Sequence, residues 1–189
     1  MTSGLVGRFV SHWPVWRIVT DRQAVEDGSV DEAGSWTMLD TAHVERLFAD
    51  DHNRVAVFHR YLSTGQAGIA LERDDEWLAY GWLATPTSGP PDHVPGSARG
   101  RYWIHYCRTS ERHQGRGLYR QTIHRLLNEA EARAGAPSAV WIDTREDNAA
   151  ARRGIERVGF EPDGVISLWR LPKASLRLSI WRRKREHPR

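Results

Sequence analysis

The sequence predicts an α/β (α+β) fold in which helices flank a mixed β-sheet. Apolar segments of strand length alternate with segments of helical periodicity, and the order strand, helix, strand, helix occupies residues 101–159. Further strand-like segments precede and follow this part, so strands from both halves are expected to share one sheet. The length suits one domain with a sizeable core, and we expect residues 1–189 to form a single domain that ends in a basic tail from about residue 182.

In the N-terminal half, two helices are expected among short strands. Asp40 and Gly65 mark helix ends, because an aspartate side chain caps a first helical turn and glycine tolerates the left-handed conformation just past a helix. The loop 86–100 is rich in Pro, Gly and Ser, and loops of this length are often functional. The other expected elements are a strand at 15–21, a polar loop at 21–35, a strand at 36–39, helices at 41–50 and 53–65, and two strands joined by a turn within 66–85.

The C-terminal half is expected to hold core strands and amphipathic helices. A helix from about Gly117 to Ala134 has an apolar stripe along one face, and Gly135 can end it. Asn148 is a candidate N-cap for a short helix that stops at Gly159. The remaining expected elements are strands at 101–109, 139–144, 165–170 and 176–182, the last two as a hairpin.

Composition and charge exclude several classes of function. The formal net charge is only +3 and no nucleic-acid-reading motif is present, so no nucleic-acid partner is expected. No apolar run approaches the roughly 20 residues that span a bilayer, and no signal peptide is evident, so no membrane partner is expected. The single cysteine, Cys107, fits a cytoplasmic protein without an internal disulfide. The histidines show no ligand spacing with cysteines or carboxylates, so no metal is expected.

A cationic, glycine-rich turn, RHQGRGLY at 112–119, stands between a predicted strand and a predicted helix. The first turn of a helix presents unpaired N–H groups and a partial positive charge, and glycines let an anion approach the backbone closely. Arg112, Arg116 and Arg120 add charge. The turn lacks the Lys-Ser/Thr pair of a Walker A loop and the third glycine of a dinucleotide fingerprint. A pyrophosphate site and a solvated surface turn therefore remain the two interpretations.

Two motifs carry a family resemblance. QGRGLY at 114–119 resembles motif A of the GNAT superfamily of acyl-CoA-dependent N-acetyltransferases, Q/R-x-x-G-x-G/A, and NAAARRGIERVGF at 148–160 resembles its motif B. One helix and one strand separate the two motifs, as in the family. The resemblance covers about residues 66–170 and implies a GNAT-like mixed central sheet with splayed central strands, flanked by helices.

The sequence also departs from the family pattern. Motif A fits when it starts at Gln114, and also when it starts at Arg112. In the first register, Tyr119 stands at the last Gly/Ala of the motif. Ile155 stands where many members carry the motif B tyrosine that protonates the thiol. Tyr106 and Tyr119 are candidate replacements for this missing acid.

The resemblance implies that acetyl-CoA is a co-substrate and lies between strands 101–109 and 139–144. The pantetheine would pair with the backbone as an added strand, and the pyrophosphate would accept N–H groups of the glycine turn. A backbone N–H near Cys107 or Arg108 would stabilise the oxyanion. The implied cofactor-binding residues are Cys107, Arg108, Thr109, Gln114, Gly115, Arg116, Gly117, Leu118, Tyr119 and Asn148.

An amine that attacks a thioester must lose a proton, so a base is wanted. Strand alternation places Trp103, His105, Cys107 and Thr109 on one face, and histidine titrates near neutrality. His105 is therefore the candidate base, with a packed strand histidine as the alternative interpretation. A nucleophile pair of Cys107 with His105 is disfavoured, because no third group is in view to orient it.

The predicted function is transfer of an acetyl group from acetyl-CoA to a primary amine of a small molecule, with an amino sugar as one candidate acceptor. Asp92 and His93 of the long loop are expected to border the acceptor side, and Asp143 and Glu146 are candidates for recognising a cationic amine. The alternative is a non-catalytic acyl-CoA-binding or sensing domain, which the missing motif B tyrosine favours. A homodimer is left open.

Overall fold

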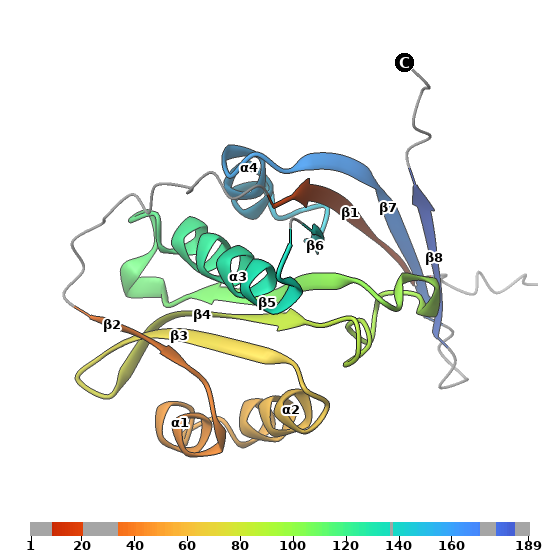
Figure 1. The fold of residues 1–189 in the computed structure, drawn as a ribbon. Helices are drawn as coiled ribbons and strands as arrows, with labels where there is room; N and C mark the ends of the chain where they lie inside the picture. The colour runs from red at the N-terminus through yellow and green to blue at the C-terminus, as the bar shows by residue number, and fades with distance from the viewer. Residues whose placement is uncertain (1–8, 21–33, 137, 171–176, 184–189) are drawn as a thin grey trace, which may run out of the picture.

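The computed structural model describes residues 9–20, 34–136, 138–170 and 177–183. These residues form one eight-stranded sheet in the order β2-β3-β4-β5-β6-β1-β7-β8 (Figure 1). Its strands are β1 (Phe9–Val19), β2 (Ser35–Met38), β3 (Ala67–Arg73), β4 (Glu76–Ala84), β5 (Tyr102–Thr109), β6 (Ala139–Asp143), β7 (Glu161–Arg170) and β8 (Arg177–Arg183). The α-helices of the described residues are α1 (Thr41–Leu47), α2 (His52–Ser63), α3 (Leu118–Ala134) and α4 (Ala149–Arg157). Strands of both halves of the chain share the sheet, as the sequence predicts.

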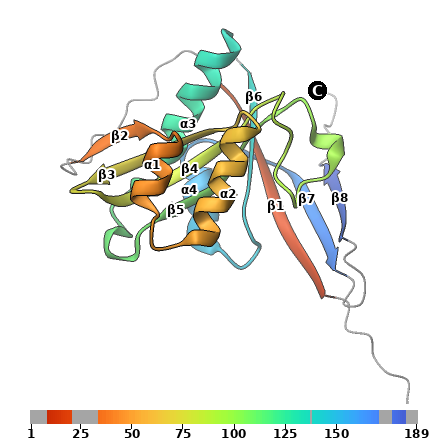
Figure 2. The same ribbon diagram turned by 90° about the horizontal axis from the view of Figure 1, so that it is seen from below.

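The sheet separates two layers of helices. Helices α3 and α4 cover one face and α1 and α2 cover the other (Figures 1 and 2). Ile123 of α3 packs against Ile104 of β5 on the first face. Phe58 of α2 packs against Trp82 of β4 on the second face, where their ring centroids are 4.9 Å apart. Each layer therefore buries its apolar side chains against the sheet, and the predicted mixed fold with flanking helices is confirmed.

The ends of several elements differ from the prediction. Strand β1 begins at Phe9, earlier than predicted, because the polar residues before Pro14 interrupt the apolar pattern that marks a strand. Strand β8 extends to Arg183, one residue beyond the predicted end of the last strand, and the guanidinium of Arg183 donates to Asp163 at 3.1 Å. Most of the predicted loop 21–35 and the chain after residue 183 lie outside the described residues.

The predicted helix caps are present. The Asp40 carboxylate accepts from the backbone N–H of His43 at 2.8 Å, and the Asn148 side chain accepts from the N–H of Ala151 at 3.1 Å. Gly65 and Gly135 follow α2 and α3 with φ values of 82° and 67°, in the left-handed region that favours glycine. These interactions join residues close in sequence, which is why the sequence alone reveals them.

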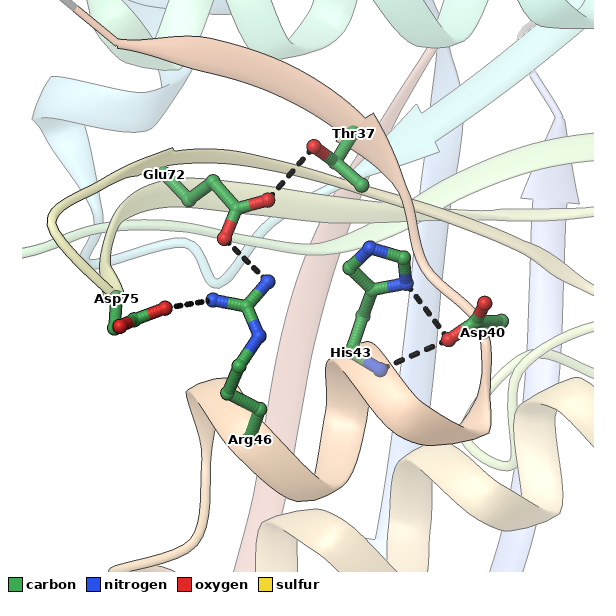
Figure 3. A network of polar contacts seen from close by, with 6 residues as sticks. All are labelled: Thr37, Asp40, His43, Arg46, Glu72 and Asp75. Carbon is green, nitrogen blue, oxygen red and sulfur yellow. Dashed lines mark hydrogen bonds and ion pairs between the residues drawn. The ribbon is translucent and has the colours of Figure 1, made fainter.

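A network of charged side chains joins α1 to the β3–β4 hairpin (Figure 3). The guanidinium of Arg46 donates to Glu72 at 2.6 Å and to Asp75 at 2.5 Å. The other oxygen of Glu72 accepts from the Thr37 hydroxyl on β2 at 2.8 Å. Burial raises the pKa of Glu72, but the hydrogen bonds from Thr37 and Arg46 outweigh burial and lower it overall. The network therefore fixes α1 over the edge of the sheet.

The two central strands separate along their length. Strands β5 and β6 are parallel and pair only from Tyr102 to Ile104 on β5 and from Val140 to Ile142 on β6. Beyond these residues β5 continues along β4 to Thr109, while β6 is paired with β1. The splayed central strands that the resemblance implies are therefore present.

A β-bulge in β5 turns its side chains at the point of separation. His105 pairs with Trp82 and Arg108 pairs with Tyr80, so two residues of β5 lie opposite Gly81. Tyr106, the first of these two residues, has a φ of 53°. The second residue, Cys107, lies on the α3 side of the sheet. A Cβ built at Gly81 would be 2.8 Å from Sγ of Cys107, and it would also contact side chains of α3.

The bulge corrects one prediction from the sequence. Simple alternation placed Cys107 and Thr109 on the same face as Trp103 and His105. The extra residue reverses the alternation, so Cys107 and Thr109 face α3, whereas Trp103 and His105 face the opposite side. The sequence pattern of β5 does not show where a bulge occurs, so alternation alone could not predict the face on which Cys107 and Thr109 lie.

None of the described helices combines the length and apolar character needed to cross a membrane. Within the same residues, no group of three or more His, Cys, Asp or Glu side chains is arranged to hold a metal ion.

Candidate active site

A cavity of about 420 Å³ lies where β5 and β6 separate. Cys107 and Tyr119 reach it from the α3 side of the sheet, and Tyr61 and His93 reach it from the α2 side. The cavity therefore touches both faces of the sheet through the gap between the strands. The other polar or aromatic residues that line it are Trp13, Asp92, His105, Tyr106, Asp143, Thr144, Arg145 and Asn148.

The structure brings only part of the predicted site to this cavity. His105, Tyr106, Cys107, Tyr119 and Asn148 line it together. The Arg108 side chain instead lines a second, more open cavity of about 570 Å³, beside α1 and α2. Glu146, considered for amine recognition, is not among the residues that line the first cavity. The cofactor-binding role predicted for Arg108 thus concerns its backbone.

The glycine turn has the geometry that the sequence predicts. Gly115 and Gly117 have φ values of 79° and 82°, and Gly117 is the N-cap of α3, where no side chain caps the helix. A Cβ at Gly115 would meet no atom within 4 Å. The Leu118 side chain is buried in the core, so only its backbone faces the turn. The turn therefore presents helix N–H groups beside open space, which is the arrangement that suits an anion.

Tyr119 follows the glycine turn in the sequence and lines the cavity. Its ring packs against Gly154 of α4, where a Cβ would be 2.9 Å from Cδ1 of the ring. The next residue, Ile155, is fully buried in the core. Burial raises the pKa of Tyr119 well above its usual value of about 10, so the hydroxyl is protonated at neutral pH and is a weaker acid than that of a free tyrosine.

His105 is buried in the wall of the cavity. Its Nε2 lies 2.8 Å from Oε1 of Gln66, and its ring is 5.0 Å from that of Tyr61 in an edge-on arrangement. Burial lowers the pKa of His105 to about 3, and the nearby His93 acts in the same direction. A proton moved to it from an amine of pKa about 10 would cost on the order of 10 kcal/mol. This environment argues against the predicted role of His105 as the base.

A histidine–carboxylate pair that the sequence did not predict stands nearby. Nε2 of His93 lies 2.7 Å from Oδ2 of Asp143, and the indole N–H of Trp103 donates to Oδ1 of Asp143 at 2.6 Å. Burial lowers the pKa of His93, but the charge and hydrogen bond of Asp143, with the charge of Asp92, outweigh burial and raise it overall. His93 and Asp143 were each singled out for the acceptor side, but their pairing joins residues 50 positions apart.

The environment of Cys107 makes its thiol a poor nucleophile. Burial raises its pKa to about 12, and its thiol donates weakly to the His105 carbonyl at 3.7 Å. These properties agree with the expectation that Cys107 and His105 do not form a nucleophile pair.

Asn148 and Tyr106 also face the cavity. Asn148 caps α4 through its side-chain oxygen, which leaves its amide N–H₂ available at the cavity. Tyr106 is 48% exposed, and its ring lies 5.6 Å from that of Phe58 and 6.2 Å from that of Tyr61. Asn148 thus faces the cavity from the start of α4, and Tyr106 faces it from the α2 side.

The mixed sheet with separated central strands agrees with a comparison of the sequence with known families. A sequence model of the Acetyltransferase (GNAT) family matches residues 33–160, and the chain belongs to this family. The curated proteins include no significant match.

Solved structures share the fold at low sequence identity. A tandem GNAT protein from the clavulanic acid biosynthesis pathway has a TM-score of 0.59 and 18% identity over 81% of this chain and 50% of its own. The aminoglycoside N-acetyltransferase AAC(6')-Iy in complex with CoA has a TM-score of 0.53 and 16% identity over 80% of this chain and 99% of its own. A protein of unknown function from Staphylococcus epidermidis has a TM-score of 0.55 and 10% identity over 85% of this chain. This chain spans only 61% of that protein's length.

Proposed function

We propose that this domain is an N-acetyltransferase that moves the acetyl group of acetyl-CoA to a primary amine of a small molecule. The observation that carries the proposal is one cavity that touches both faces of the sheet between β5 and β6. On one side lies Tyr119, which follows the glycine turn, and on the other lie Tyr61 of α2 and the acidic and aromatic residues of the loop before β5. A thioester and an amine that enter from opposite sides would meet at the gap.

The cofactor side is proposed to hold acetyl-CoA mainly by backbone groups. The pyrophosphate would accept hydrogen bonds from backbone N–H groups between Gln114 and Tyr119, where glycines in the left-handed conformation leave open space. The pantetheine arm would extend along the backbone of Cys107 to Thr109, beside which β6 is no longer paired. The amide of Asn148 would face the same arm from α4. The GNAT structure AAC(6')-Iy in complex with CoA supports the choice of this ligand.

The bulge in β5 suggests how the reaction is assisted. Its extra residue interrupts the regular pairing of β5 with β4 at Tyr106 and Cys107, and a backbone N–H at this point is proposed to stabilise the oxyanion. The protonated hydroxyl of Tyr119 is the group proposed to protonate the departing thiolate, and Tyr106 is the alternative acid. His105 would act by holding the cavity wall in place, since burial keeps it neutral.

The acceptor is proposed to be a small cationic amine, with amino sugars and aminoglycosides as candidates. Asp92 and the rings of Tyr61 and Trp13 line that side of the cavity, and such groups suit a cation that carries a flat or cyclic body. The structural likeness to an aminoglycoside N-acetyltransferase supports including aminoglycosides among the amines tested.

A non-catalytic acyl-CoA-binding or sensing domain is the competing function, and Ile155 is the residue that favours it. Calorimetry with CoA and an assay of thiol release from acetyl-CoA, with aminoglycosides, amino sugars, polyamines and arylalkylamines, separate the two. Amine-dependent release of CoA, with an acetylated amine found by mass spectrometry, is the result expected of the enzyme. Tight CoA binding without release for any amine supports the sensing domain instead.

A further inference from the structure

We infer that His93, oriented by Asp143 and Trp103, is the catalytic base that takes the proton of the acceptor amine. The inference rests on the proposed function and adds the identity of the proton acceptor to it. Two of the three residues belong to strands of the splayed pair, since Trp103 lies on β5 and Asp143 lies at the end of β6. The third belongs to the loop before β5.

The hydrogen bonds fix the tautomer of His93. An ionised carboxylate only accepts, so Nε2 of His93, 2.7 Å from Oδ2 of Asp143, must carry the proton. The lone pair of the neutral ring is then on Nδ1. Among the described residues, Nδ1 makes no hydrogen bond, and His93 lines the cavity with 22% of its side chain exposed. The basic nitrogen is thus left for a ligand.

Asp143 is itself held in one position. Its side chain is only 2% exposed, and its second oxygen accepts from Trp103 at 2.6 Å. A buried carboxylate that touches a neutral imidazole stabilises the imidazolium that forms when the ring accepts a proton. Asp143 and Trp103 are positioning residues, because they act through His93.

The loop that carries His93 is also anchored on both sides of the ring. The Ser179 hydroxyl on β8 donates to the carbonyl of His93 at 2.7 Å, and Arg60 of α2 donates to Asp92 at 2.9 Å. The ring of Trp13 lies 4.5 Å from the ring of His93. These contacts restrict the movement of the loop and of the ring, and a proton transfer requires a base in a fixed position.

The proton and electron changes balance without a further reactant. The ammonium form of the acceptor gives one proton to Nδ1 of His93, and the freed lone pair forms the N–C bond as the carbonyl pair moves to oxygen. Collapse of the intermediate breaks the C–S bond, and sulfur leaves with the electron pair. The nitrogen releases its second proton to solvent, the thiolate takes a proton from Tyr119, and Tyr119 and His93 return to their starting states by exchange with solvent.

Several charged or titratable groups surround His93 and shape its pH dependence. Asp143 of β6 and Asp92 of its own loop favour the imidazolium, whereas a charge on His93 disfavours a charge on His105 of β5. Arg145 and Tyr61 line the same cavity from the loop after β6 and from α2. The net direction for His93 is a pKa above 6.5, so the base becomes active only as pH rises through a value above that of an ordinary histidine.

The test uses the full chain, acetyl-CoA and the amine of the panel that gives the fastest thiol release. His93→Gln is expected to lower kcat about 10²- to 10⁴-fold and to leave the affinity for CoA unchanged, since a general base contributes about that factor. The deficit is expected to narrow at pH values above the pKa of the amine, because the acceptor then arrives neutral. In His93→Gly, added imidazole is expected to restore part of kcat, which a purely structural role of His93 does not predict.

Asp143→Asn is the second variant. Its side-chain oxygen can accept from Trp103, so its N–H₂ then faces Nε2 of His93 and forces the proton onto Nδ1. The basic nitrogen would be lost without a change in shape. The expected result is a loss in kcat comparable with that of His93→Gln, and ¹⁵N NMR of the imidazole is expected to show the change of tautomer directly.

The outcomes distinguish this inference from the proposed function. Amine-dependent turnover in the wild type, with superimposable profiles of kcat/KM against pH for the wild type and His93→Gln, would overturn the inference and leave the proposed function standing. Turnover that is lost in His105→Gln but kept in His93→Gln would overturn it in favour of His105. CoA binding without turnover for any amine would overturn both.

Discussion

The aromatic ring of Tyr119 lies directly against the backbone of Gly154, so that a Cβ at position 154 would be 2.9 Å from Cδ1 of the ring. The contact lets a side chain from α3 reach the cavity over α4. The neighbouring Ile155 is fully buried in the core and offers no polar group. Gly154 therefore leaves room for the ring of Tyr119 at the cavity, and the tyrosine hydroxyl is a polar group that Ile155 does not supply.

Tyr119→Phe removes this hydroxyl and keeps the ring. If Tyr119 protonates the thiolate, kcat is expected to fall by about 10²-fold or more, while the affinity for CoA changes little. Steady-state kinetics and calorimetry provide the two measurements. Tyr106→Phe is the matched comparison, because its ring lines the same cavity from the other face. A loss that appears only in Tyr106→Phe would assign the acid to Tyr106.

Gly154→Ala tests the contact itself. The added methyl group comes closer to the ring than a normal contact allows, so Tyr119 must move. We expect kcat to fall in Gly154→Ala. We also expect no further fall when Gly154→Ala is added to Tyr119→Phe, because the two changes act on one hydroxyl. Additive losses in the double variant would mean that Gly154 matters for another reason.

The glycine turn offers a matched pair of substitutions. Gly115 and Gly65 have φ values of 79° and 82°, and a Cβ at either meets no atom within 4 Å. Alanine in the left-handed region costs about 1–2 kcal/mol of stability at each. Only Gly115→Ala places a methyl group where the pyrophosphate is proposed to approach, so only this variant is expected to lose CoA affinity, by about tenfold or more. Equal CoA affinities by calorimetry would remove the turn as the pyrophosphate site.

How far the sequence predicts the structure depends on the distance over which each feature is encoded. The cap at Asp40 and the glycine turn before α3 were predicted, because both involve residues within three or four positions of one another. The splayed strands followed from the family resemblance and not from periodicity. The prediction that His105 and Cys107 lie on one face of the sheet was wrong. The bulge at Tyr106 reverses the alternation, and it depends on pairing with β4, which is distant in sequence.

The candidate site shows the same limit. His93 and Asp143 were each noted, but the 2.7 Å contact between them needs the loop before β5 to fold back over the end of β6. His105 looked like a base because a free histidine titrates near neutrality. Its burial beside Gln66 changes this property, and burial is not visible in a strand pattern whose neighbours are unknown. Local chemistry was therefore predictable, and electrostatic environment was not.

The network around Arg46 predicts a stability effect that leaves the active site untouched. Glu72, with 13% of its side chain exposed, is more buried than Asp75 at 80%, so the bond to Glu72 is the one that contributes. Arg46→Ala is expected to cost about 1 kcal/mol of the free energy of unfolding in urea, with unchanged turnover. Asp75→Asn is the control and is expected to have no measurable effect. An equal loss in both variants would mean that the exposed pair matters as much as the buried one.

The same network predicts a dependence on acid pH. The folded pKa of Glu72 is lowered, so its stabilisation is present above the unfolded pKa of about 4.3 and is lost as pH falls through the folded value. The stability difference between the wild type and Arg46→Ala is therefore expected to shrink below about pH 4.3. Urea unfolding at pH 7 and at a pH below 4 measures it, and a difference independent of pH would argue against a charged Glu72 as the partner.

His105 provides the sharpest test of burial. Its folded pKa is about 3, below the 6.5 of an unfolded histidine, so the unfolded chain binds this proton first. Its contribution to stability is therefore complete above pH 6.5 and is lost as pH falls toward 3. Between pH 7 and 4.5 the wild type is expected to lose about 3 kcal/mol more than His105→Gln, whose amide can still donate to Gln66. Urea unfolding of both proteins at the two pH values measures this difference. Equal losses would mean that His105 is solvated enough to titrate normally, and its role as a base would then return.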